Sequence, residues 1–251
     1  MTDAKLRPLV QDHLRFLVSP AEHSTFTFEL DELDSCLVGR GLRTGALHEV
    51  MGHSCTLADE ASAVLFVAGI AARAAKGCDR PVLWTSCRND LYAPGLAQVG
   101  LSPARLIQAQ PPDDVALLAV VEDALCDGTP ATIVAEVREV SMVASRRIQL
   151  AAADADILVL LLRQRRSRDQ DPFAEPSAAW TRWRIGSAPS ERLIVAGVGR
   201  SRWLVELVRQ RGGEPFSMIL EGCDETGRLA VPAASADRAA EAAGTIRHKA
   251  A

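Results

Sequence analysis

The turn Gly52-His53-Ser54-Cys55-Thr56 joins a short apolar strand to an Ala-rich helix. A strand, a glycine-containing turn and a helix in this order can hold phosphate groups, because the first N–H groups of the helix are free to bind an anion. A complete phosphate-binding loop reads G-x-x-x-x-G-K-[ST], with lysine on the outer phosphates and a hydroxyl on magnesium. Only Gly52 fits that pattern. We therefore predict a degenerate loop (Gly52, His53, Ser54, Cys55 and Thr56) and no nucleotide cofactor.

No nearby residue replaces the missing lysine. The next lysine along the chain, Lys76, follows the helix and lies roughly 27 Å from its start, at about 1.5 Å per residue. Asp59 and Glu60 place two carboxylates in the first helical turn, where they suit the helix dipole but repel a polyphosphate. The alternative interpretation is a residual anion pocket that uses Ser54 and Thr56.

Other chemistry-bearing residues do not form a recognisable site. His48 and His53 flank the turn, but no nearby serine or carboxylate has the spacing of a catalytic triad or a metal site. The six cysteines contain no CxxC pair, so the sequence indicates neither zinc nor a disulfide framework. We predict no catalytic residues and no metal ligands, and therefore a protein that is not an enzyme.

The elements around the turn follow an alternating order. Strands are predicted at 46–51, 81–86, 106–110, 132–137 and 157–162, and helices at 58–76, 91–99, 113–126 and 141–153, with Asp113 as an N-cap. Such alternation predicts an α/β fold with a mainly parallel sheet and helices on both faces. Short alternating segments at 182–185, 193–198, 203–208 and 216–220 predict an antiparallel C-terminal edge.

Length and composition indicate one folded unit with two extensions. The 251 residues are 48% hydrophobic and 24% charged, which is typical of a globular domain. We expect an N-terminal amphipathic helix at 1–20, a domain at 21–223 and a mobile Ala-rich tail at 224–251. The N-terminal sequence has no apolar core of a signal peptide, and no apolar run is long enough to span a bilayer. A cytoplasmic location is therefore expected.

Two further sequence patterns carry a family resemblance. The run Gly39-x-Gly41-Leu42-x-x-Gly45-Ala46-Leu47-x-Glu49-Val50-x-Gly52 resembles the segment before the phosphate loop of RecA recombinases. Leu91-Tyr92-Ala93 with Leu106-Ile107-Gln108, and Arg202-Trp203 with the later Arg211-Gly212-Gly213-Glu214-Pro215, extend the match over about residues 30–222. Together these motifs resemble the ImuA family of damage-inducible mutagenesis proteins.

The resemblance implies a RecA-like domain with a degenerate phosphate loop and a role in the SOS response. It implies a non-catalytic accessory protein of error-prone translesion DNA synthesis that bridges an ImuB-like polymerase homologue and an error-prone C-family polymerase, with RecA as a further candidate partner. The alternatives are a SulA-like inhibitor that binds the tubulin-like cell-division protein, and a divergent ATPase.

The same resemblance implies which catalytic and DNA-binding features of RecA are lost. Trp84-Thr85-Ser86-Cys87 stands where RecA carries its water-activating glutamate, and Glu136 is predicted to be a hydrogen-bonded or solvated strand-end residue. The first DNA-binding loop is reduced to residues 138–140. The second corresponds to 163–179 and provides the candidate DNA contacts Arg163, Arg165, Arg166 and Arg168.

These four arginines have two interpretations. The net charge of −4 gives no overall attraction to nucleic acid, so any phosphate contact must be local and is expected to be weak or indirect. A solvated polar loop is the alternative.

A partner surface is predicted at the C-terminal edge of the sheet. An edge strand leaves unpaired backbone groups that a partner can satisfy, and the two glycines after Arg211 would let that edge protrude. The candidate partner-binding residues are Trp203, Arg211, Gly212, Gly213, Glu214 and Pro215. The alternative is that Trp203 packs inside the sheet and that the turn serves only as a hairpin.

Overall fold

The computed structural model describes residues 24–165, 170–190, 197 and 199–232. The predicted helix at 1–20, most of the predicted strand at 193–198 and the tail beyond residue 232 lie outside these residues. In the described part of the chain, no helix is long and apolar enough to cross a membrane.

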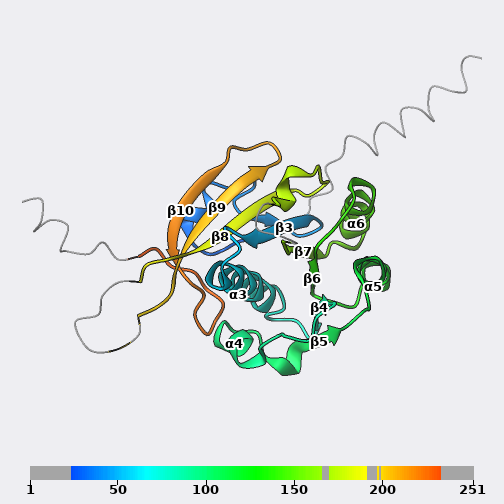
Figure 1. The fold of residues 1–251 in the computed structure, drawn as a ribbon, viewed down its shortest axis with the longest axis horizontal. Helices are drawn as coiled ribbons and strands as arrows, with labels where there is room; N and C mark the ends of the chain where they lie inside the picture. Colours follow the sequence, from blue (N-terminus) through cyan, green and yellow to red (C-terminus); the bar gives the residue numbers. More distant parts are fainter. Residues whose placement is uncertain (1–23, 166–169, 191–196, 198, 233–251) are drawn as a thin grey trace, which may run out of the picture.

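The fold is an α/β sandwich built on an eight-stranded sheet (Figure 1). The strands are β3 (Leu47–Gly52), β4 (Val82–Ser86), β5 (Leu106–Ala109), β6 (Thr132–Val137), β7 (Leu158–Arg163), β8 (Thr181–Ala188), β9 (Arg202–Gln210) and β10 (Phe216–Glu221). Their order in the sheet is β10-β9-β8-β3-β7-β6-β4-β5. A separate two-stranded sheet pairs β1 (Thr25–Phe26) with β2 (Leu42–Arg43).

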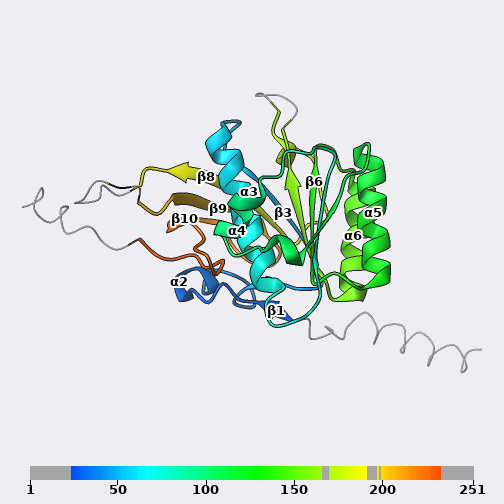
Figure 2. The same cartoon turned by 90° about the horizontal axis from the view of Figure 1, so that it is seen from below.

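Helices cover both faces of the larger sheet, as Figure 2 shows from below. α3 (Leu57–Ala74) and α4 (Ala93–Gln98) pack on one face, and α5 (Asp114–Asp127) and α6 (Met142–Ala155) on the other. The short elements are α2 (Asp31–Asp34) and the 3-10 turns η1 (Pro103–Arg105) and η2 (Pro172–Ala174). Asp113 and Ser141 cap α5 and α6 by accepting backbone N–H groups, which fixes where each helix begins. The predicted α/β class is confirmed.

The antiparallel edge begins one strand later than expected. β8, which contains the predicted segment 182–185, runs parallel to β3 and becomes antiparallel only toward β9. β9 and β10 are antiparallel to each other and form one edge of the sheet. β7 and β8 lie on either side of β3 and run in the same direction, so the chain must cross over between them. The long connection from β7 to β8 allows this crossover, which a tight turn could not make.

An aromatic cluster fills the space between α3 and the antiparallel edge. The ring of Phe66 from α3 lies 5.9 Å from that of Trp183 in β8 and 6.4 Å from that of Trp203 in β9, measured between centroids. Phe28 and Phe216 contact the Trp183 ring from two further segments. The antiparallel strands therefore share the core of the parallel sheet and belong to the same domain.

Residues 224–232, assigned to the tail by composition, fold back onto the domain. Glu221 forms a β-bridge with Ala230, and Leu229 is buried. A Cβ added to Gly69 of α3 would lie 2.4 Å from the Cys223 sulfur, so the glycine permits this close approach. Burial raises the pKa of the Cys223 thiol to about 12.

His48 makes the stability of the fold sensitive to acid. Its buried ring contacts the Thr181 hydroxyl at 2.7 Å through Nδ1 and the Arg43 carbonyl at 2.9 Å through Nε2. Burial lowers the pKa of His48 from 6.5 to about 4, although the hydrogen bond to Arg43 acts in the opposite direction. The folded protein therefore keeps His48 neutral in a pH range where the unfolded chain takes up a proton.

We expect stability to fall as pH drops from 6.5 to 4. At pH 4 the loss from this group is about 3 kcal/mol, since each unit of pKa difference is about 1.4 kcal/mol. Urea unfolding across this range should show a smaller loss for His48→Gln, with the exposed His53→Gln as control. Equal pH dependence in wild type and His48→Gln would contradict this assignment.

Candidate functional site

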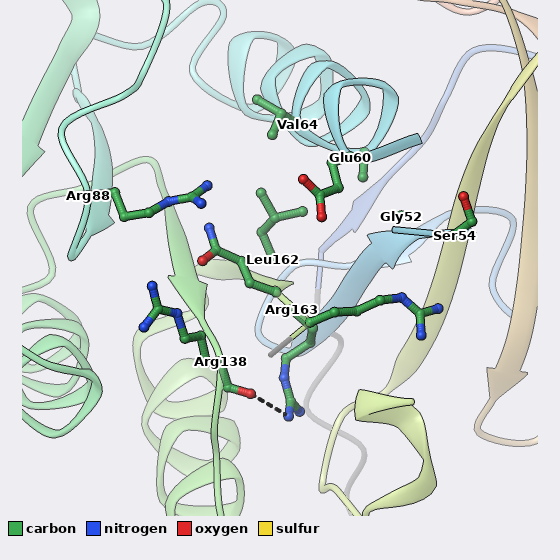
Figure 3. Close-up of a pocket in the computed structure, with 11 residues that line it drawn as sticks. Gly52, Ser54, Glu60, Val64, Arg88, Arg138, Leu162 and Arg163 are labelled. Atoms are coloured by element: carbon green, nitrogen blue, oxygen red, sulfur yellow. Dashed lines mark hydrogen bonds between the residues drawn. The ribbon is translucent and has the colours of Figure 1, made fainter. Parts of the chain in front are cut away.

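A pocket of about 390 Å³ lies where the central parallel strands end and α3 begins. This edge is where parallel α/β sheets bind ligands, because the strand ends and helix N-termini converge there. Figure 3 shows that Arg88, which follows β4, and Glu60 on α3 both point into the pocket. It is lined by Gly52, Ser54, Glu60, Ala63, Val64, Arg88, Arg138, Leu162, Arg163, Gln164 and Arg165.

Gly52 and Ser54 of the predicted degenerate loop line this pocket, and the donor groups of Ser54 are already occupied. The Asp59 carboxylate accepts hydrogen bonds from the Ser54 N–H at 2.9 Å, the Ser54 hydroxyl at 2.5 Å and the Ser187 N–H at 2.7 Å. A carboxylate of the chain itself thus takes the place that a phosphate would need. Burial alone would raise the pKa of Asp59, but these hydrogen bonds lower it below its ordinary value.

The turn is also tightly closed. Thr56 is the N-cap of α3 and accepts the Asp59 N–H. A Cβ at Gly52 would lie 3.0 Å from the Ser54 carbonyl oxygen and 3.2 Å from the Asp59 backbone, so the chain doubles back closely at this glycine. The alternative anion pocket built from Ser54 and Thr56 is disfavoured, since both hydroxyls are engaged within the turn.

The cationic groups of the pocket are arginines. Arg88 pairs with Asp90, with 3.1 Å between Nε and Oδ2, and the Arg165 guanidinium donates to the backbone carbonyls of Gln170 and His53. Arg138 is exposed at the rim. Lys76, the only lysine in the described segments, follows α3 and does not line the pocket. The pocket can hold a small anionic group by guanidinium hydrogen bonds.

Glu136, near the end of β6, is a hydrogen-bonded residue, as predicted. Its carboxylate accepts from the Trp84 indole at 2.7 Å and from the Gln164 amide at 2.7 Å. Burial raises the pKa of Glu136, and the hydrogen bond from Trp84 acts against that rise. Within the described ranges, no cluster of three or more His, Cys, Asp or Glu side chains is arranged to hold a metal ion.

The prediction of a DNA contact is wrong for Arg163. Its side chain is 1% exposed and donates to the buried Glu49 carboxylate at 3.0 Å. Arg182 from β8 lies on the other side of Glu49, with 2.8 Å between Nε and Oε2. Arg163 is held inside the sheet by this ion triad, and its guanidinium is already paired with a carboxylate. Arg165 is half-buried at the pocket, while Arg166 and Arg168 lie outside the described residues.

The candidate partner surface divides into a buried and an exposed part. For Trp203 the structure agrees with the alternative, packing inside the sheet, because the residue is 2% exposed and contacts Phe66 in the core. The turn that follows β9 is largely exposed and contains the other five candidates: Arg211, Gly212, Gly213, Glu214 and Pro215.

The conformation of this turn requires both glycines. Gly212 has a φ of 76°, and a Cβ at Gly213 would lie 2.6 Å from the Gln210 side chain. Gln210 in turn donates to the Glu214 carbonyl and to Cys36. The turn is therefore held in one shape and presents its remaining residues at the surface.

Two groups of functional interest were not predicted from the sequence. The first is the Asp59 carboxylate as an occupant of the loop, because the carboxylate was interpreted only through its charge. The second is the half-buried Trp180, over whose ring the guanidinium groups of Arg43 and Arg211 both lie. Residues 43, 180 and 211 are too far apart in sequence for any local pattern to connect them.

Comparison with known proteins gives one consistent relationship. No protein-family model matches the chain. The chain is 36% identical over 200 residues to Protein ImuA of Caulobacter vibrioides strain NA1000 / CB15N, covering 78% of this chain and 82% of that protein. The match to Protein ImuA of Caulobacter vibrioides strain ATCC 19089 / CIP 103742 / CB 15 has the same identity and coverage. The similarity thus extends over most of each protein.

Proposed function

Because the chain belongs to the ImuA family, we propose that it is a non-catalytic accessory protein of SOS-induced, error-prone translesion DNA synthesis. In this role it bridges an ImuB-like polymerase homologue and an error-prone C-family polymerase. Family membership supports damage-inducible mutagenesis as the process. The Asp59 carboxylate supports the absence of catalysis, and the outer edge of β10 supports the bridging role.

The observation that carries the non-catalytic part is the Asp59 carboxylate in the turn after β3. To bind ATP there, the protein would have to displace a carboxylate held by three hydrogen bonds and accept its repulsion of the phosphates. The pocket also lacks the lysine that contacts the outer phosphates in working phosphate loops. We therefore propose a RecA-like domain in which the nucleotide site has become part of the scaffold.

The bridging part is supported by the outer edge of β10. Glu221 exchanges both backbone hydrogen bonds with Ala230, so its N–H and C=O point away from β9. Because backbone groups alternate along a strand, those of Ile219 and Ser217 point the same way. Ile219 is also 44% exposed. A strand from a partner can pair with this edge by β-augmentation.

Co-purification of the full chain tests the bridging role. We expect the chain to retain an ImuB-like homologue from the same organism and not the tubulin-like cell-division protein. Ile219→Pro should weaken the interaction, because proline removes an outward N–H and leaves the β9 pairing intact. The control Ile219→Thr keeps that N–H. Retention of the division protein instead would overturn the proposal.

Calorimetry tests the non-catalytic part. We expect the purified chain not to bind ATP in the presence of magnesium. The Asp59 carboxylate repels the phosphates, and no lysine is present in the turn to contact the outer phosphates. Magnesium-dependent ATP binding at micromolar concentration would contradict this prediction and support a divergent ATPase.

A further inference from the structure

Two arginines lie over the Trp180 ring at the end of the sheet opposite the pocket, and a third, Arg209, lies close to Arg211. Trp180 directly precedes β8, Arg43 ends β2, and Arg209 and Arg211 lie at the end of β9. The guanidinium carbon lies 4.5 Å from the centre of the indole ring for Arg43 and 5.2 Å for Arg211. We call Arg43, Trp180, Arg209 and Arg211 the arginine–tryptophan cluster.

The backbone holds the arginine–tryptophan cluster in place. The Trp180 carbonyl accepts the Arg211 N–H at 3.1 Å, and the Arg211 guanidinium donates to the Ala178 carbonyl at 2.7 Å. The Arg43 carbonyl contacts the buried His48 ring. The guanidinium contact reduces the freedom that the Arg211 side chain would lose on binding a ligand, which favours affinity.

Within the described residues, the three arginines of the cluster have no ion pair at short range. Across the described ranges, none of its three arginines has a carboxylate oxygen within 4.0 Å. The Arg43 Nε is buried and has no hydrogen-bond partner. Burial and the neighbouring Arg211 charge lower the pKa of Arg43, although Asp156 acts in the opposite direction. An anionic ligand would relieve the repulsion and supply the missing hydrogen-bond acceptors.

We propose that the arginine–tryptophan cluster binds an acidic segment of a partner protein, with aspartate or glutamate carboxylates across the guanidinium groups. Planar guanidinium groups match carboxylates in a two-point geometry. The cluster lies at the same end of β9 as the Arg211–Pro215 turn, which leads into the exposed β10 edge. This inference rests on the proposed function for the identity of the partner, but not for the chemistry of the site.

Nucleic acid fits the cluster less well. Three phosphate contacts to duplex DNA would give an affinity that does not depend on base sequence. The logarithm of the binding constant would fall with the logarithm of the salt concentration at a slope of about 2.7, or about 0.9 per contact. A chain with a net charge of −4 adds no long-range attraction to such a small patch. The indole ring also already carries two guanidinium groups, which a stacking base would have to displace.

The test is fluorescence anisotropy of the full chain with two labelled probes: a peptide of alternating Glu and Gly, and single-stranded oligo-dT of similar charge. We expect the peptide to bind more tightly than the oligonucleotide. The double variant Arg43→Gln/Arg211→Gln should weaken peptide binding by about tenfold or more, given the value of charge-assisted hydrogen bonds. Arg146 is an exposed arginine on α6, and its variant Arg146→Gln is the control for loss of positive charge. This variant should bind the peptide as tightly as wild type does.

Two readouts separate a binding role from a structural one. Melting temperatures identify a double variant that fails to fold. In that case Arg43→Lys/Arg211→Lys keeps both charges but not the two-point geometry, and should bind the peptide more weakly than wild type. Absence of peptide binding to wild type, or tighter binding of oligo-dT that depends on the same arginines, would overturn the proposal.

Co-purification separates this inference from the proposed function. If the double variant retains the ImuB-like homologue at full strength while losing the peptide, that homologue does not supply the acidic segment and the proposed function stands. If wild type binds the peptide but retains no ImuB-like homologue, the bridging proposal fails and the acidic-segment site stands.

Discussion

Replacing Glu49 with leucine should destabilise the protein by about 3 to 5 kcal/mol, because it leaves two buried arginines without a counter-charge. Glu49 is completely buried in β3, between Arg163 of β7 and Arg182 of β8. Leucine keeps the position filled with an apolar side chain, so no large cavity forms and loss of the charge is the main change. Urea denaturation of the purified variant measures the effect as a shift of the unfolding midpoint.

Two further variants show whether charge is the cause. Replacing all three members together, as Glu49→Leu/Arg163→Met/Arg182→Met, should recover much of the lost stability, since a buried ion group can often be exchanged for apolar residues at little cost. Glu60→Gln removes an exposed carboxylate at the pocket and should leave the midpoint nearly unchanged. A Glu49→Leu midpoint equal to that of wild type would show that the ion triad contributes nothing to stability.

Replacing Val50 with aspartate should prevent folding. Val50 is fully buried in β3, the strand that joins the parallel part of the sheet to β8, and it pairs with Leu162 on one side and Trp183 on the other. A carboxylate at this position has no cationic partner in the surrounding core cluster and would cost several kcal/mol even if it took up a proton. That loss is comparable to the whole stability of a typical domain.

Circular dichroism melting and soluble yield measure the outcome. Val38→Asp makes the same chemical change at a side chain that is 45% exposed, and should fold with a melting temperature close to that of wild type. A soluble Val50→Asp protein with an unchanged melting temperature would show that β3 is not the central buried strand that the structure describes.

The sequence predicted the local elements closely because they depend on local causes. The run 132–137 is rich in β-branched residues and forms a strand with those bounds. Asp113 caps its helix because its side-chain oxygen can reach the Ala116 N–H only when a helix starts there. The missing lysine and second glycine of the phosphate loop are facts of residue identity, so no structure was needed to recognise them.

Contacts between strands decided what the sequence could not. In the sequence, Arg163 stands at the start of a polar, arginine-rich loop. In the structure it is buried, because Glu49, 114 residues away along the chain, lies on the neighbouring strand and pairs with it. Trp203 has the pattern of an edge residue and is buried because Phe66 of α3 packs against it. A periodic pattern of apolar residues indicates which face of a helix or strand is buried. It does not report which charge lies across the sheet from a given position.

The sequence by itself thus determined the α/β class, the position of most elements and the absence of a G-x-x-x-x-G-K-[ST] pattern after β3. Only the tertiary structure decided the parallel pairing of β8, the hydrogen bonds of Asp59 within the turn, and the packing of Arg43 and Arg211 over Trp180. The physical reason is that local propensity depends on neighbours along the chain. Burial of a charge, and the partner that makes it tolerable, depend on neighbours in space.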